Sequence, residues 1–60
     1  MEAWQERVVA EKAELDGRIE RLKAALENGI ADLVQRDLMR RQLGYMEAYS
    51  LTLRDRIEAF

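Results

Sequence analysis

The feature that most constrains this chain is a pair of long stretches with helical apolar spacing. In residues 2–27 and again in residues 32–58, apolar side chains recur at intervals of three and four, which places them on one stripe of an α-helix; the first stripe has one gap, at Glu11 and Lys12. No proline interrupts either stretch, because the chain contains none. The sequence therefore predicts two helices, each long enough to form one half of a helical hairpin.

The short segment between the two stretches carries the signals that end one helix and begin the next. Gly29 follows Asn28, and a glycine just past the last helical turn takes the left-handed conformation at little cost. Asp32 is a suitable N-cap for the second helix. Because so short a connection brings consecutive helices side by side, the fold class is predicted to be all-α, an antiparallel two-helix hairpin forming a single domain over residues 1–60.

The two apolar stripes can be aligned along this hairpin. Their members are Trp4, Val8, Leu15, Ile19, Leu22 and Leu26 in the first helix, and Met39, Leu43, Met46, Ser50, Leu53, Ile57 and Phe60 in the second. An antiparallel arrangement pairs Leu22 with Met39, Leu15 with Met46, Val8 with Leu53, and Trp4 with Ile57 and Phe60. Ser50 is the only polar member of the second stripe.

One hairpin does not use all of the apolar residues. Val34, Leu38 and Tyr45 form a second patch beside the stripe of the second helix, and Leu33 and Leu51 lie on its far side. A chain of 60 residues buries little surface on folding, and small domains usually add disulfides, a metal or oligomerisation. The chain has no cysteine or histidine, so disulfides and structural zinc are excluded. The remaining route is a helical homo-oligomer.

Composition and charge narrow the possible partners. A net charge of −2 argues against binding to DNA or RNA duplexes, which usually requires a strongly basic balance. No stretch approaches 18 apolar residues, so no membrane span or membrane partner is expected. A signal peptide begins with basic residues and continues with an apolar run, whereas this chain has Glu2 and Glu6 there, so no signal peptide is expected. We therefore expect the protein in the cytoplasm.

The sequence offers nothing that resembles a catalytic centre. Histidine and cysteine are absent, Ser50 is the only serine, and the carboxylates are scattered among basic neighbours. Such charge runs usually form solvated faces, and Asn28-Gly29 is more simply a helix end than a phosphate loop. We expect no enzyme activity, no catalytic residue, no cofactor and no bound metal.

Polar residues at the edges of the two stripes are the candidates for ligand binding. They are Arg7, Glu11, Gln42, Tyr45, Tyr49 and Arg56. Arginine offers a planar fork that suits phosphate, and tyrosine offers a stacking face and a hydroxyl. The alternative is structural: Glu11 satisfies Arg7, Arg18 or the Tyr49 hydroxyl at a subunit seam, and the tyrosines anchor an interface.

A basic cluster at the start of the second helix has two interpretations as well. Asp32 and Asp37 precede Arg36 and Arg41 by four residues, a spacing that favours ion pairs within a helix. The other interpretation is that these arginines, with Arg40, bind a phosphate or an acidic partner.

The chain resembles a family of small phage proteins. The resemblance rests on WQERVVAEKAELD over residues 4–16, on RQLGYMEAYS over residues 41–50, and on Leu53, Arg56 and Ile57. The helical hairpin of this family is shared by the type 2 anti-CBASS and the type 1 anti-Thoeris proteins, which are hexameric sponges that sequester cyclic nucleotide immune signals. The resemblance implies a phage anti-defence sponge acting in the cytoplasm of the infected bacterial host.

The resemblance also implies roles for the candidate residues. Arg7 and Arg56 contact phosphates, Glu11 orients an arginine, and Gln42 reads a base edge, while a tyrosine at position 45 or 49 stacks or holds a ribose. The chain lacks a short segment that looks like the dinucleotide-binding part of the anti-CBASS protein. The hairpin alone implies a pocket at a three-fold axis of a hexamer, which suits a cyclic trinucleotide. Two alternatives stay open: a helical interaction protein that inhibits a host protein, and a coiled-coil element without a ligand.

Overall fold

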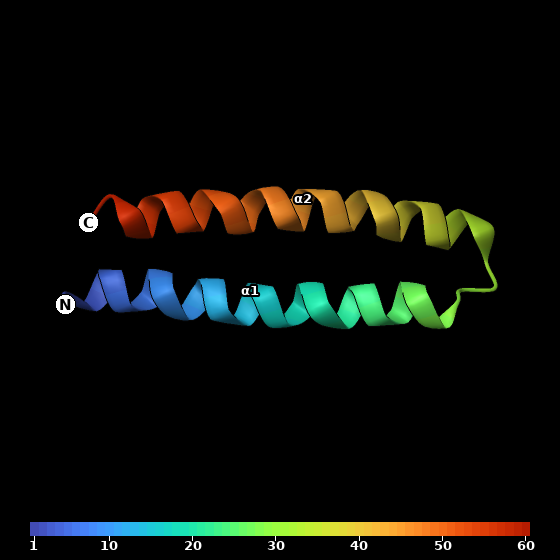
Figure 1. Cartoon of the computed structure of the whole chain (residues 1–60), viewed down its shortest axis with the longest axis horizontal. Coiled ribbons are helices and arrows are strands. Elements are labelled where there is room, and N and C mark those ends of the chain that lie inside the picture. The colour runs from blue at the N-terminus through green and yellow to red at the C-terminus, as the bar shows by residue number, and fades with distance from the viewer.

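The protein is an antiparallel hairpin of two helices of equal length (Figure 1). A computed structural model describes residues 1–60, with α1 at Ala3–Asn28 and α2 at Leu33–Glu58. The molecule is a rod of 45 × 14 × 13 Å, and both termini lie at the end opposite the loop. It contains no strand and no helix apolar enough over a sufficient length to cross a membrane. The predicted all-α hairpin is confirmed.

The helix ends follow the local sequence signals. Asp32 is the N-cap of α2, because its Oδ1 accepts a hydrogen bond of 3.1 Å from the backbone N–H of Gln35. At the start of α1, the Gln5 side chain accepts a 2.7 Å hydrogen bond from the backbone N–H of Glu2. Both helices thus begin one residue later than predicted, because residues 2 and 32 are caps that precede the first helical position.

Gly29 ends α1 as predicted, although its backbone is not left-handed helical. It has φ 93° and ψ 136°, and its N–H reaches the carbonyl oxygen of Leu26 at 3.3 Å. A positive φ combined with an extended ψ is accessible almost only to glycine. This residue therefore lets the chain leave α1 and turn back within four residues.

The core lies in the middle of the hairpin and in the part nearer the termini. Four residues are buried, namely Val8, Leu15, Ile19 and Leu53, and Leu43, Met46 and Ile57 pack against them. The predicted contact at the open end also forms, since the rings of Trp4 and Phe60 meet edge to face with centroids 5.1 Å apart. No residue between Ile19 and Leu53 is buried, so the part of the hairpin between Ile19 and the loop has no enclosed core.

Candidate functional site

A hydrogen bond between the helices identifies one flank of the hairpin. The Tyr49 hydroxyl of α2 donates to Oε2 of Glu11 in α1 at 2.5 Å. Both side chains lie at the edge of the apolar seam, where a residue can reach across to the other helix and still contact solvent. The Tyr49 hydroxyl was one of three partners predicted for Glu11 if its role is structural. The hydrogen bond forms within one chain rather than between subunits.

Helical spacing places the other candidates on the same flank. Along α1, Arg7 precedes Glu11 by four positions, Arg18 follows Glu11 by seven, and Arg21 follows Arg18 by three. Along α2, the successive intervals from Gln42 through Tyr45 and Tyr49 to Arg56 are three, four and seven. Residues at such intervals share a helix face. We call this surface the polar flank, and its members are Arg7, Glu11, Arg18 and Arg21 on α1 and Gln42, Tyr45, Tyr49 and Arg56 on α2.

The arginines of the polar flank are free of ion pairs. The five ion pairs of the protein use Lys12, Lys23, Arg36 and Arg54, so none of them involves an arginine of the polar flank. The acidic residues on the same face of α1 are Glu11 and Glu14, and Glu11 already accepts a hydrogen bond from the Tyr49 hydroxyl. Four exposed arginines without an ion pair therefore share this flank by helical position, with few competing carboxylates.

The tyrosines add exposed aromatic surface to this flank. Tyr45 is 71% exposed and Tyr49 is 46% exposed, so both rings can be reached by a flat ligand. The hydrogen bond to the Glu11 carboxylate raises the pKa of Tyr49, with smaller effects from desolvation and from the charge of Glu11, while nearby Arg56 lowers it. Tyr49 therefore stays neutral at physiological pH, and its hydroxyl keeps the ring anchored.

The expected ion pairs in the basic cluster do not form. Arg36 lies near Asp37, with Nε 3.9 Å from Oδ1, and makes no pair with Asp32. Asp32 instead caps α2, and Arg41 appears in none of the five ion pairs. The prediction of ion pairs from Asp32 to Arg36 and from Asp37 to Arg41 was therefore wrong. The Asp32 carboxylate serves as the N-cap, and the Asp37 carboxylate lies near its neighbour Arg36.

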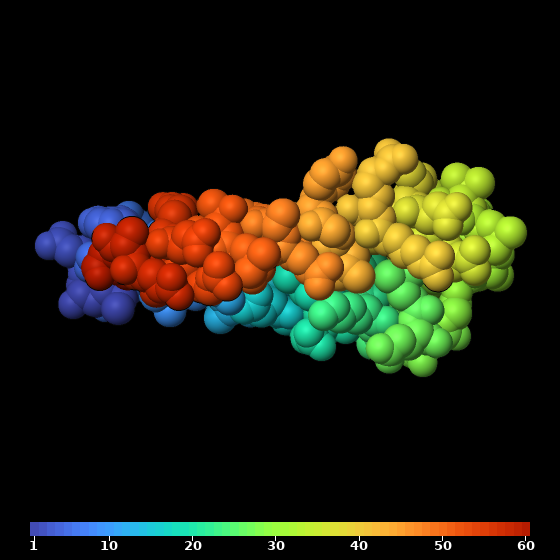
Figure 2. All heavy atoms as spheres, turned by 45° about the horizontal axis from the view of Figure 1, so that its top comes forward, coloured from blue at the N-terminus to red at the C-terminus, as the bar shows by residue number.

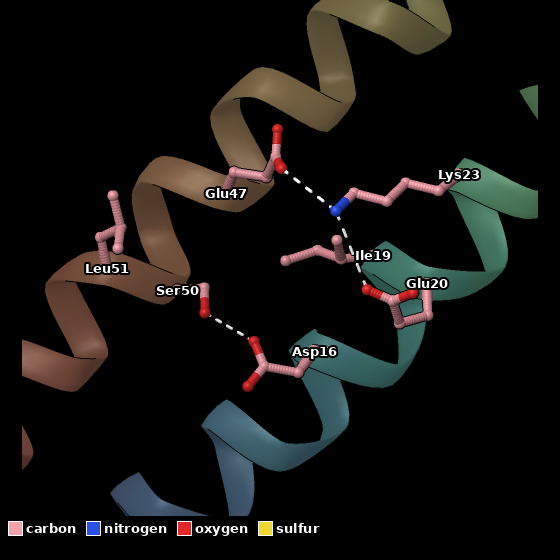
Figure 3. A pocket seen from close by; sticks show the side chains of 7 residues that line it. All are labelled: Asp16, Ile19, Glu20, Lys23, Glu47, Ser50 and Leu51. Atoms are coloured by element: carbon pink, nitrogen blue, oxygen red, sulfur yellow. Dashed lines mark hydrogen bonds and ion pairs between the residues drawn. The ribbon is translucent and has the colours of Figure 1, made fainter.

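The opposite side of the hairpin holds an open groove of about 440 Å³ (Figure 3). It is lined by Asp16, Ile19, Glu20 and Lys23 of α1 and by Glu47, Ser50 and Leu51 of α2. Lys23 lies between two carboxylates, 3.8 Å from Glu20 and 3.5 Å from Glu47. With three acidic residues and one lysine that is already paired, this groove does not suit an anionic ligand.

Asp16 connects the two helices on the groove side. Its Oδ1 accepts the Ser50 hydroxyl at 2.5 Å, and its Oδ2 lies 2.8 Å from Lys12 Nζ. The hydrogen bond from Lys12 and then that from Ser50 lower the pKa of Asp16, against a smaller opposing effect of desolvation. Asp16 was not among the predicted site residues, although Ser50, the polar residue in an otherwise apolar stripe, was a signal for a polar partner on the other helix.

The comparisons with known proteins give this hairpin a family. Residues 2–59 match the family model described as Sequestin. The chain belongs to the Sequestin family. No curated protein and no solved structure matches the chain significantly. The name Sequestin denotes sequestration, so membership indicates a binding role rather than catalysis, in agreement with the resemblance to phage hairpin sponges.

Proposed function

We propose that this Sequestin protein binds cyclic oligonucleotide immune signals on its polar flank and holds them without cleaving them. Cyclic trinucleotides are the favoured ligands, and the favoured assembly is a homohexamer in the cytoplasm of an infected bacterium. The host defence effector would then lack its activating signal.

The observation that supports this proposal most is the set of unpaired arginines beside exposed tyrosines. Arg7, Arg18, Arg21 and Arg56 have no acidic partner, while the rings of Tyr45 and Tyr49 lie along the same side. Guanidinium groups bind phosphate through charge-assisted hydrogen bonds, and aromatic faces stack on bases of any sequence. A cyclic oligonucleotide presents both kinds of group at its surface.

Each residue of the flank has a chemical task in this proposal. Arg7 and Arg56 contact phosphates, and Gln42 offers an amide to a base edge. Tyr45 stacks on a base. Glu11 has a positioning task, because it holds the Tyr49 hydroxyl and so fixes the ring that a base or ribose would contact.

The test is isothermal titration with a panel of cyclic tri- and dinucleotides, comparing Arg56→Ala with Arg54→Ala. Arg54 lies two residues away, off the flank, and is occupied with Asp55 at 3.1 Å. Losing one charge-assisted contact to phosphate should weaken binding by about tenfold or more. We expect that loss in Arg56→Ala and in Arg7→Ala, and almost none in Arg54→Ala.

The number of chains per bound nucleotide, measured in the same titration, tests where the binding pocket lies in the assembly. One trinucleotide for three chains would agree with a pocket at a three-fold axis. Absence of heat with every nucleotide, together with recovery of one stoichiometric host protein from a bacterial lysate, would favour the alternative function as an inhibitor of a host protein.

A further inference from the structure

Both helices interrupt their apolar stripe at the same level of the hairpin. Lys12 stands four residues after one stripe member of α1 and three before the next, and Ser50 has the same spacing in α2. Both residues are half-buried, although the two helices pack against each other along the rod (Figure 2). The buried residues lie on both sides of this level, with Val8 and Leu53 towards the termini and Leu15 and Ile19 towards the loop. A polar level within an apolar seam lowers stability, so its presence calls for another role.

The polar level carries hydrogen bonds on both sides of the hairpin. On the polar flank, the Tyr49 hydroxyl donates to Glu11. On the groove side, the Ser50 hydroxyl donates to Asp16 (Figure 3), and Lys12 donates to the same carboxylate. Glu11 and Lys12 are neighbours in α1, and Tyr49 and Ser50 are neighbours in α2. We call the hydrogen bonds of Lys12, Asp16 and Ser50 the groove-side link.

Two interhelical bonds on opposite sides of one level restrain the helices more than a single bond does. Neighbouring residues leave a helix about 100° apart, and Tyr49 and Ser50 accordingly reach α1 at opposite edges of the seam. A single bond would act as a hinge about which α2 could turn. With both bonds in place, a turn of α2 that keeps one hydroxyl on its carboxylate moves the other hydroxyl out of hydrogen-bond geometry.

We infer that the groove-side link is a positioning device for the polar flank, because it holds the two helices where Glu11 can keep the Tyr49 ring in place. None of its three residues belongs to the polar flank, so they act through Tyr49. The consequence for ligand binding rests on the proposed function, in which the Tyr49 ring contacts a base or ribose. A ring that is already ordered loses less conformational freedom when a ligand binds, and affinity rises accordingly.

The first test follows Tyr49 itself and needs no nucleotide. The hydrogen bond to Glu11 raises the pKa of Tyr49. Because ionised tyrosine absorbs ultraviolet light that neutral tyrosine does not, absorbance measured against pH reports this pKa. The chain has two tyrosines, so every form compared carries Tyr45→Phe and keeps only one. Glu11→Gln calibrates the measurement, because removing the carboxylate should lower the pKa of Tyr49 towards the ordinary tyrosine value of 10.0.

Ser50→Ala should lower the pKa of Tyr49 in the same direction as Glu11→Gln, and Ser50→Thr, which keeps a hydroxyl, should restore it. Thr52→Ala is the matched control. The Thr52 hydroxyl donates within α2, to the carbonyl oxygen of Ala48 at 3.0 Å, so its removal leaves both interhelical bonds intact. The same Tyr49 pKa in Ser50→Ala and in Thr52→Ala would overturn the inference.

A second variant removes the groove-side bond without weakening the seam. Ser50→Leu completes the apolar stripe of α2, and replacing buried polar residues by apolar ones is often neutral or stabilising. Its helical signal in circular dichroism should therefore melt at or above the wild-type temperature, while the pKa of Tyr49 falls as in Ser50→Ala. A link that only stabilised the hairpin would make both quantities fall together. A Tyr49 pKa that stays raised in Ser50→Leu would contradict a positioning role.

Titration with the cyclic tri- and dinucleotides then tests the consequence for binding. Ser50→Ala should bind about fivefold more weakly than the wild type, the factor that one neutral hydrogen bond contributes. Ser50→Thr should bind as the wild type does. Arg56→Ala should lose binding while the pKa of Tyr49 stays raised, because the charge of Arg56 lowers that pKa in the wild type.

The two measurements separate this inference from the proposed function. If Ser50→Ala lowers the pKa of Tyr49 but no nucleotide binds to any form, the positioning role stands and the proposed function fails. If Ser50→Ala lowers that pKa and binds nucleotide with wild-type affinity, the proposed function stands, and the inferred consequence for ligand binding is wrong.

Discussion

At the scale of single residues, a few polar side chains link two otherwise amphipathic helices. Tyr49 and Glu11 connect the helices on one flank, while Ser50, Asp16 and Lys12 connect them on the other. Each link includes a carboxyl group that accepts a hydrogen bond from a hydroxyl, and Asp16 also accepts one from the charged Lys12. The stability of the hairpin should therefore depend on pH through Asp16.

Asp16→Asn should be less stable than the wild type at pH 7. The pKa of Asp16 is lowered from 3.8 in the folded state, so its contribution is present above pH 3.8 and is lost as pH falls through the folded pKa. Thermal unfolding followed by circular dichroism should show the melting temperatures of Asp16→Asn and the wild type converging as the pH falls below 3.8.

The control for this comparison is Asp55→Asn. Asp55 pairs only with its neighbour Arg54, at 3.1 Å and in an exposed position. The melting temperature of Asp55→Asn should stay close to that of the wild type at every pH. A gap between Asp16→Asn and the wild type that is constant from pH 7 to pH 2 would contradict an ionised Asp16 as the source of the stabilisation.

At the scale of elements, the two helices are defined by their ends more than by their interiors. Asp32 caps α2, and Gly29 gives the chain a backbone conformation that other residues adopt only with strain. Gly44, in contrast, is an ordinary helical residue, and a Cβ added there meets nothing within 4 Å. The two glycines should thus respond oppositely to the same substitution.

Gly29→Ala should lower the free energy of unfolding by about 1 kcal/mol or more, because alanine is strained at φ 93°. Gly44→Ala should raise it by up to about 1 kcal/mol, because alanine favours the helix. Urea unfolding of both variants measures the changes. Destabilisation of similar size at both positions would mean that Gly44 is closely approached by another chain.

At the scale of the whole molecule, the protein is a thin rod with a core of four residues. Leu53 is the only large side chain that is 0% exposed, and it lies among Val8, Leu15 and Ile19. Natural domains are stable by about 0.05–0.15 kcal/mol per residue. For a chain of this length, one core residue contributes a large share of that total.

Leu53→Ala should cost about 2–5 kcal/mol and leave the chain largely unfolded at 37 °C. Leu51→Ala, in a residue two positions away with half of its surface exposed, should change stability by about 0.5 kcal/mol or less. The helical signal in circular dichroism on heating distinguishes them. A cooperative transition unchanged by Leu53→Ala would mean that the hairpin is held mainly by contacts outside this core.

The sequence alone determined which segments are helical and how they pair. Spacing of three and four defines an apolar face on each helix, Gly29 and Asp32 fix where the chain turns, and antiparallel alignment predicted the contact of Trp4 with Phe60. The helix ends and apolar faces are local features, and the pairing of the helices follows from aligning two antiparallel stripes. All of these can be predicted from the sequence. The six candidate site residues were also selected from their types and spacing, and their role in binding stays a prediction.

Only the tertiary structure decided which polar groups meet and where burial ends. It brought Tyr49 to Glu11 and Ser50 to Asp16, placed Arg36 near Asp37, and left the loop end of the hairpin without buried residues. Periodicity fixes the face that a helix presents, but it does not fix the rotamers of long side chains, the competition among partners, or the closeness of two helices along their length. Those depend on the packing of both helices at once, and packing exists only in three dimensions.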